Sequence, residues 1–166
     1  VVLSPEDDHE ASDFVENTTS MLLFVTLFLT IIFFFGMPYI IQVLAPGFTD
    51  NKEAYELAVH FGKIIFPYII FISLAAHFAS INNVHERFAA GAFAPAILNI
   101  SFILSLFVLT PLLPSAGHAL SYGVLVGGVL QFLYLYWTVL KFYRPRIRIP
   151  VLNDKLKKFF SLFLPG

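Results

Sequence analysis

The sequence predicts an all-α membrane protein, a polytopic helix bundle with four transmembrane helices and a C-terminal interfacial amphipathic helix. Hydrophobic residues make up 58% of the chain and charged residues 13%, whereas an average soluble domain has about 25% charged residues. The apolar residues gather in four runs, each long enough to cross a hydrocarbon layer of about 30 Å. A soluble fold of this size could not bury so much apolar surface, so we expect the bilayer to act as its solvent.

An acidic segment, residues 1–19, precedes the first of these runs. Its carboxylates are Glu6, Asp7, Asp8, Glu10, Asp13 and Glu16. Ser4 and Pro5 followed by acidic residues are typical of a helix start, because serine caps the first turn and acids favour the helix dipole. No basic region stands before the first apolar run, so we expect no secretory signal peptide.

The transmembrane region is expected over residues 20–142, with spans at about 20–44, 58–81, 88–113 and 119–142. The first run carries no charged residue, and Ala45-Pro46-Gly47-Phe48 ends it with a sequence typical of a turn. The second and third runs are separated by a short polar turn, whose residues are Asn82, Asn83, His85, Glu86 and Arg87. This succession predicts four helices that cross the membrane in alternating directions.

Prolines and glycines mark special positions within the spans. Pro67 and Pro95 lie near the starts of the second and third apolar segments, where each predicts a bend that shapes the bundle. Gly123 and Gly127 are four residues apart and share one face of the fourth span, where another helix can approach closely. This spacing also occurs in dimerisation motifs, but we favour packing inside the bundle.

The last segment, residues 143–166, is basic. It carries Arg144, Arg146, Arg148, Lys155, Lys157 and Lys158 against a single acid, Asp154. The positive-inside rule therefore predicts a cytoplasmic tail, and four spans return the chain to its starting side, so both termini are expected in the cytoplasm. Apolar residues recur at helical spacing beside the lysines, which predicts an amphipathic helix on the inner leaflet, at Leu156, Phe159, Phe160 and Phe163. A helix that docks on a partner protein is the alternative.

The signatures of enzymes and metal proteins are absent from the sequence. The chain has no cysteine, which excludes disulfides and thiolate metal sites. It contains no Gly-rich phosphate loop, no HExxH and no GxSxG. His77 and His85 have no carboxylate besides Glu86 near them in the sequence, which does not favour a metal site. We expect hydrogen bonds from them to other helices or to lipid headgroups instead. We therefore expect no catalytic residue, no cofactor, no metal and no nucleic-acid partner.

Several distinctive segments follow one another along the chain: IIQVLAPGF from Ile40, FPYIIFISLAA from Phe66, Asn82-Asn83, Arg87-Phe88, AFAPAILNI from Ala92, GVLVGGVLQ from Gly123 and RPRIRI from Arg144. In this order and spacing they resemble the MurJ/MviN lipid II flippases of the multidrug/oligosaccharidyl-lipid/polysaccharide exporter superfamily. The resemblance covers nearly the whole chain. It implies that the four spans correspond to the third through sixth of about fourteen helices in a multi-pass protein of the bacterial inner membrane.

Members of that family translocate the undecaprenyl-pyrophosphate-linked peptidoglycan precursor, lipid II, by alternating access between two helix bundles around a cationic cavity. The resemblance therefore implies a transporter rather than an enzyme. Its implied partners are lipid II, membrane lipids and the missing helices of a full-length flippase. The family's arginines most tied to substrate lie mainly in its first, second and eighth helices, which no segment of this chain matches.

The candidate substrate-binding residues in this chain are Lys63, Arg87 and Asn99. Lys63 stands where the family commonly has an arginine just before the FPY motif, and it either lines the cavity or anchors the outer interface. Arg87 either contacts the lipid pyrophosphate at the cytoplasmic mouth or acts as a topology determinant. Asn99, like Ser101, is a polar residue within the third span, where packing between helices is the alternative role.

Two hypotheses about function remain open at this point. In the first, this chain is part of a lipid II flippase, truncated or excerpted from a longer protein and incomplete alone. The start at Val1 rather than methionine favours this hypothesis. The second is a small four-span structural or assembly membrane protein without transport activity, which packs against a complete flippase. A stand-alone transporter built by oligomerisation is a weaker third hypothesis.

Overall fold

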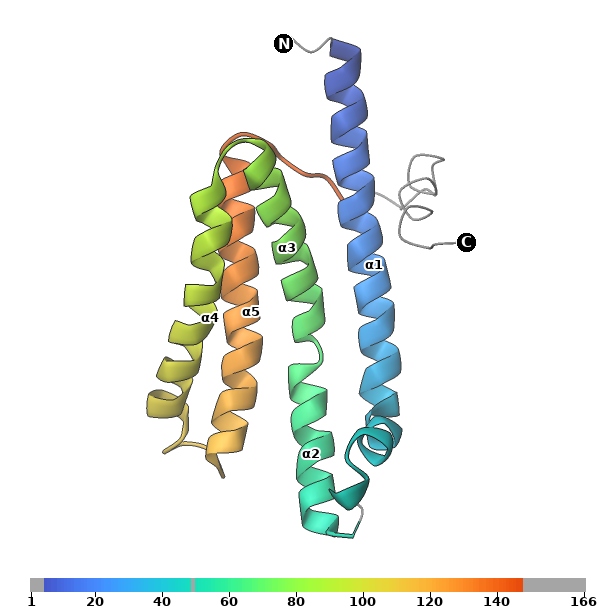
Figure 1. Ribbon diagram of the computed structural model, residues 1–166, viewed down its shortest axis with the longest axis vertical. Helices are drawn as coiled ribbons and strands as arrows, with labels where there is room; N and C mark the ends of the chain where they lie inside the picture. The colour runs from blue at the N-terminus through green and yellow to red at the C-terminus, as the bar shows by residue number, and fades with distance from the viewer. Residues whose placement is uncertain (1–4, 49, 148–166) are drawn as a thin grey trace.

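A computed structural model describes residues 5–48 and 50–147, with side chains from residue 12 onward, and over these ranges the chain is helical without strands (Figure 1). The elements in chain order are α1 (Pro5–Leu44), the 3₁₀ turn η1 (Pro46–Phe48), α2 (Lys52–Ile65), α3 (Tyr68–Val84), α4 (Phe88–Leu109) and α5 (Ala116–Leu140). The predicted C-terminal amphipathic helix lies among residues 148–166, outside the described residues.

Within the described ranges, four helical stretches are long and apolar enough to cross a membrane, namely Ser12–Leu44, Lys52–Val84, Phe88–Leu109 and Ala116–Leu140. They confirm the predicted all-helical membrane fold with four spans. Helix α1 runs without interruption through residue 19, so the acidic segment and the first span form one helix rather than two separate elements. The polar turn is shorter than predicted, because α3 continues through Asn82 and Asn83 to Val84.

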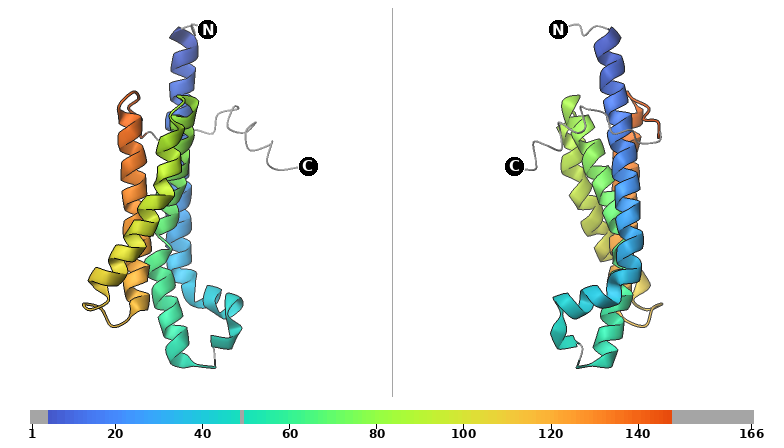
Figure 2. Two further views of the ribbon diagram at one scale, coloured as in Figure 1. Left: turned by 60° about the vertical axis from the view of Figure 1, so that its left-hand side comes forward. Right: turned by 90° about the vertical axis from the view of Figure 1, so that its right-hand side faces the viewer.

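Successive spans run in opposite directions. The start of α1, the turn between α3 and α4, and the end of α5 lie at one end of the bundle, while η1 and the turn before α5 lie at the other (Figures 1 and 2). Helix α5 packs against α3 and α4, and α1 packs against α2 and α3. The last turns of α1, which contain Pro38, run out of line with the rest of the helix (Figure 2).

The second span is two helices placed end to end, where the sequence predicted one bent helix. Helix α2 begins after Asn51, whose side chain accepts a hydrogen bond from the Ala54 N–H at 3.2 Å. It ends at Ile65, and α3 starts at Tyr68. Because Pro67 has no N–H, the carbonyl of Lys63 loses its helical donor and the helix stops there. Pro95 is different, since α4 continues through it.

The core lies where α3, α4 and α5 meet, and it is built from alanine, branched aliphatic residues and one phenylalanine, namely Ala75, Phe78, Ile81, Ala90, Ala94, Leu135 and Val139. The outer surface is apolar: Phe28 is 64% exposed, Phe35 74% and Phe107 79%. Helix α1 buries polar residues instead, among them Thr19, Ser20, Thr26 and Thr30. Apolar side chains outside and hydroxyls inside are the arrangement expected when lipid, not water, surrounds the helices.

Candidate functional site

Lys63 lies in the last turn of α2, directly before the break in the second span. Its Nζ is 5.3 Å from the centroid of the Phe34 ring on α1, a cation–π distance that stabilises by about 0.5–2 kcal/mol. Among residues 12–48 and 50–147, the ion pairs do not include Lys63. A positive charge within a membrane span and without a carboxylate partner is a candidate site for an anionic ligand.

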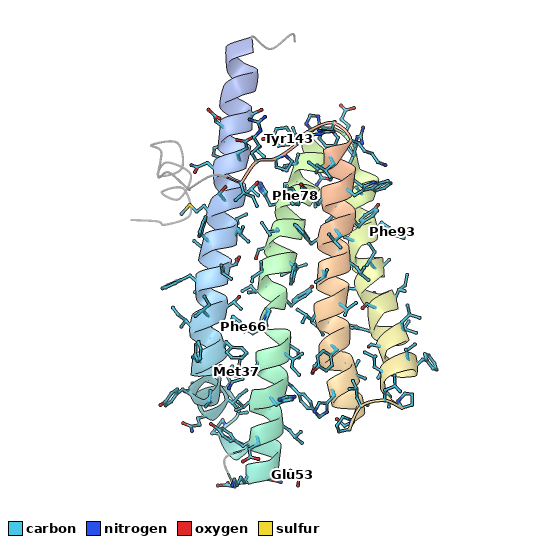
Figure 3. All side chains as sticks on the ribbon, turned by 180° about the vertical axis from the view of Figure 1, so that it is seen from behind. Met37, Glu53, Phe66, Phe78, Phe93 and Tyr143 are labelled. Atoms are coloured by element: carbon cyan, nitrogen blue, oxygen red, sulfur yellow. The ribbon has the colours of Figure 1, made fainter. Side chains whose placement is uncertain are left out.

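Aromatic and sulfur contacts hold both sides of the break against α1. The ring of Phe66 stacks on Phe33, with centroids 4.6 Å apart and planes 12° apart. Gly62 faces Met37, and a Cβ at position 62 would lie 2.6 Å from the Met37 sulfur, so glycine permits the close approach. Figure 3 shows Met37 and Phe66 together between α1 and the second span. The break and Lys63 therefore have a fixed position relative to α1.

Arg87 lies at the end of the bundle, in the tight turn between α3 and α4. Its N–H donates to the Asn82 carbonyl at 2.8 Å, and Glu86 has a φ of 60°, the left-handed conformation that reverses the chain after a helix. The Arg87 guanidinium carbon lies 4.7 Å from the centroid of the Phe142 ring, just beyond α5. The side chain is exposed, so it presents its charge to water or to lipid headgroups at this end.

Further cations gather at the same end of the bundle. Lys141 Nζ lies 3.6 Å from the centroid of the Trp137 ring, and Arg144 and Arg146 follow in the segment after α5. Tyr143 connects this segment to α1 by donating from its hydroxyl to the Ser12 carbonyl at 3.2 Å (Figure 3). Lysines and arginines together with aromatic residues are typical of a cytoplasmic membrane interface, and the acidic residues at the start of α1 contribute little to this rule.

Asn99 is exposed on α4, away from the helix contacts that Ser101 makes. Ser101 is buried and donates from its hydroxyl to the Gly123 carbonyl at 2.9 Å, which joins α4 to α5. A packing role between helices was the alternative for both residues. Within the described part of the chain, Ser101 makes such a contact and the exposed Asn99 does not. The structure does not join Lys63, Arg87 and Asn99 into one site, since they lie near the α2–α3 break, at the α3–α4 turn and on the surface of α4.

The two glycines singled out in the sequence face α4. A Cβ at Gly123 would lie 2.8 Å from the Ser105 Cβ, and one at Gly127 would lie 2.7 Å from Leu98 Cδ1. Both positions are buried, so the absence of side chains lets α4 and α5 pack closely. Beside Pro95, the Gln131 Nε2 donates to the Ala94 carbonyl at 2.9 Å and links the same two helices.

Two further polar contacts join helices; sequence reasoning missed the one made by Asn82, whereas a hydrogen bond between helices was among the roles expected for His77. The Asn82 Nδ2 donates to Thr138 Oγ1 at 2.9 Å, which joins α3 to α5, and Asn82 is completely buried. Thr19 Oγ1 and His77 Nε2 lie 2.9 Å apart and join α1 to α3. In neither case did the sequence identify the partner, because Thr138 and Thr19 are distant in the chain from Asn82 and His77.

A cavity of about 250 Å³ lies next to the Thr19 contact, between α1, α3 and α5. Its lining combines Thr19 and Tyr136 with apolar side chains from the three helices, and the segment after α5 contributes Pro145 and Ile147. Along α1, the buried hydroxyls bond to carbonyls of their own helix, as Ser20 does to Glu16 at 2.8 Å and Thr30 to Thr26 at 2.7 Å. The inner face of α1 is therefore polar without carrying unsatisfied hydroxyls at these positions.

The family described as lipid II flippase MurJ matches residues 2–166. The chain belongs to this family. The lipid II flippase MurJ of Burkholderia cenocepacia is 34% identical over 129 residues, which are 77% of this chain and 25% of that protein. The probable lipid II flippase MurJ of Rhizobium meliloti is 36% identical over 169 residues, covering 94% of this chain and 30% of the relative. The resemblance stated from the sequence is thus confirmed.

A third relative likewise matches most of this chain, while this chain matches only about a quarter of the relative. The probable lipid II flippase MurJ of Rickettsia prowazekii is 33% identical over 141 residues, covering 85% of this chain and 27% of that protein. The chain therefore spans between 25% and 30% of the length of these family members.

Proposed function

We propose that this chain supplies four transmembrane helices of a lipid II flippase, which moves the lipid-linked peptidoglycan precursor across the bacterial inner membrane. The observation that carries the proposal is the family match over residues 2–166. The four apolar spans and the polar inner face of α1 support it. The proposed activity is transport rather than catalysis. Its rate and specificity therefore depend on which side chains face the substrate as it crosses the membrane.

The helices act, in this proposal, together with the further helices present in the longer relatives. Lys63 faces the pyrophosphate, because a cation already inside the span offsets part of the cost of removing a phosphate from water. Arg87 stands at the cytoplasmic mouth, where it contacts the substrate headgroup before entry. Asn99, exposed on α4, offers an amide to substrate or to a helix from the rest of the protein.

The orientation that we propose places both termini in the cytoplasm. The support is the distribution of charge: Arg87, Lys141, Arg144 and Arg146 all lie at the end of the bundle where α1 begins. The other described cations, Lys52 and Lys63, lie on α2, which starts at the opposite end. The end where α1 begins therefore carries more lysine and arginine than the opposite end, as the positive-inside rule expects of the cytoplasmic side.

A chimera tests the proposed transport. The matching helices of the Burkholderia cenocepacia relative are replaced by this chain, and growth is measured in cells depleted of their own flippase. We expect rescue by the chimera and by its Lys63→Arg variant, and reduced rescue by Lys63→Ala. Lys52→Ala is the matched control, because Lys52 is an exposed lysine on the same helix that pairs with Glu56 at 3.8 Å. No rescue by a chimera of normal abundance would contradict the proposal.

The alternative is a small structural or assembly membrane protein with four spans and without transport activity. The two are separated by the size of the native product, detected in its own membranes with an antibody. A band several times larger than 18.7 kDa supports a complete flippase. A band near 18.7 kDa favours the small protein and directs the search to the helices it contacts.

A further inference from the structure

Two histidines from different helices meet at the end of the bundle opposite Arg87. His60 lies in α2 and His118 in the first turns of α5, and their ring centroids are 5.3 Å apart with planes at 51°. This pair is not apparent from the sequence, because α3 and α4 lie between the two residues in the chain. Imidazole nitrogens are favoured ligands of zinc, copper and nickel ions.

The ring of His118 is held in place before any ligand binds. Its Nδ1 lies 2.9 Å from Ser115 Oγ, and the ring of Phe61 meets it edge-on with centroids 4.9 Å apart and planes at 85°. Ser115 is the N-cap residue of α5, yet its side chain makes no capping hydrogen bond. The hydroxyl instead forms a hydrogen bond with the imidazole of His118. When Nδ1–H donates to Ser115, the lone pair is on Nε2, which is the arrangement of a metal-binding histidine with a supporting partner.

The spacing of the two rings also fits a shared ion. Two imidazoles bound to one tetrahedral zinc ion, with Zn–N distances of about 2.0–2.1 Å, place their centroids about 5 Å apart. Gly117 leaves room for the Phe61 ring beside His118, since a Cβ at position 117 would lie 2.7 Å from Phe61 Cζ and would displace that ring. His60 is exposed and His118 half-buried, so an ion can reach the pair from water.

We propose that His60 and His118 together bind a divalent transition-metal ion of the zinc type and thereby tie α2 to the start of α5. The described residues bring no third histidine or carboxylate into a metal-binding group, so water completes the coordination and the ion is exchangeable. The chain has no cysteine that competes for the ion. This site goes beyond the proposed transport and does not depend on it.

The test is calorimetric titration of the intact chain, purified in detergent without a histidine tag, with zinc chloride. We expect one zinc ion per chain, and at least a tenfold loss of affinity in His60→Ala and in His118→Ala. Ser115→Ala keeps both ligands but loses the partner of Nδ1, and its affinity falls about tenfold. His85→Ala is the matched control, because this exposed histidine lies in the turn at the other end of the bundle.

Two results would overturn the site. One is zinc affinity in His60→Ala or His118→Ala within twofold of the unsubstituted chain, and the other is an equal loss in His85→Ala. Gel filtration and circular dichroism check that the variants keep the fold. Electron paramagnetic resonance of the unsubstituted chain with Cu²⁺ needs no variant: two coupled imidazole nitrogens support the pair, and a single nitrogen refutes it.

Discussion

Single polar side chains set how neighbouring helices of this bundle pack. Asn82 bonds to Thr138, Gln131 to the Ala94 carbonyl and Ser101 to the Gly123 carbonyl, each at 2.9 Å. Lipid is as apolar as leucine, so helices gain little hydrophobic energy by meeting, and one such bond contributes about 0.6–2 kcal/mol. Its larger effect is on register, because these donors and acceptors meet only in one alignment of α3, α4 and α5.

The close approach at Gly123 leads to a prediction about stability. In Gly123→Ala, the new Cβ meets Ser105 Cβ at 2.8 Å, so Ser105 must move and α4 and α5 separate. We expect the free energy of unfolding to fall by about 1–3 kcal/mol. Gly36→Ala is the control, because its Cβ would meet only Ile40 Cδ1 at 4.0 Å, and alanine in a helix stabilises by about 0.5–1 kcal/mol over glycine.

Unfolding of both variants is measured in mixed detergent micelles as the fraction of denaturing detergent rises. Equal stability of Gly123→Ala and the unsubstituted chain would show that α4 and α5 are not packed through this glycine. A loss in Gly36→Ala as large as in Gly123→Ala would point to a general effect of the substitution rather than to the helix contact.

At the scale of single residues, the sequence identified the polar positions within the spans but not which helix face each of them occupies. Asn99 and Ser101 were grouped as polar residues of one span, yet two residues along a helix turn a side chain through about 200°, so they lie on nearly opposite faces. Which face is buried depends on α5, which lies further along the chain. Asn82 was assigned to a turn because its hydrogen-bond partner, Thr138, lies far along the chain on α5 and cannot be identified from the neighbouring sequence.

Among the elements, the break between α2 and α3 differs most from the sequence-based expectation. Both Pro67 and Pro95 remove a backbone donor, but only Pro67 ends a helix. At the break, the N–H groups of Ile69 and Ile70 donate to the carbonyls of Phe66 and Pro67 at 3.0 and 3.2 Å, three residues back. Proline in the sequence predicts a lost bond, whereas the choice between a kink and a break depends on the surrounding contacts with α1.

Pro67→Ala is expected to restore a continuous helix. Alanine supplies an N–H that reaches the Lys63 carbonyl, so Ile69 and Ile70 can exchange bonds three residues back for the stronger ones four residues back. Hydrogen–deuterium exchange at these two amides should slow, as measured by mass spectrometry in detergent. In Pro95→Ala, the control, exchange at Ile69 and Ile70 stays as in the unsubstituted chain; faster or unchanged exchange in Pro67→Ala would contradict the prediction.

At the scale of the whole molecule, composition was sufficient to predict the class of fold. A span in lipid must satisfy its backbone internally, which leaves helices as the simple solution, and length then fixes the number of crossings. The sequence therefore predicted four spans, and the described residues contain four helical stretches of sufficient length and hydropathy. The partners of the apolar surface are not determined by composition, because an exposed residue such as Phe107 packs equally well on lipid and on another helix.

The last prediction concerns orientation. The chain has no cysteine, so single substitutions report on one position each. In intact cells, an impermeant maleimide should label Lys52→Cys, whereas Arg87→Cys should react only after lysis, because Arg87 shares its end of the bundle with the basic segment after α5. Since Arg87 itself contributes to topology, Asn83→Cys provides an exposed position at that end with the arginine intact. Labelling of Asn83→Cys from outside, or of Lys52→Cys only from inside, would reverse the proposed orientation and move Arg87 away from the cytoplasmic mouth.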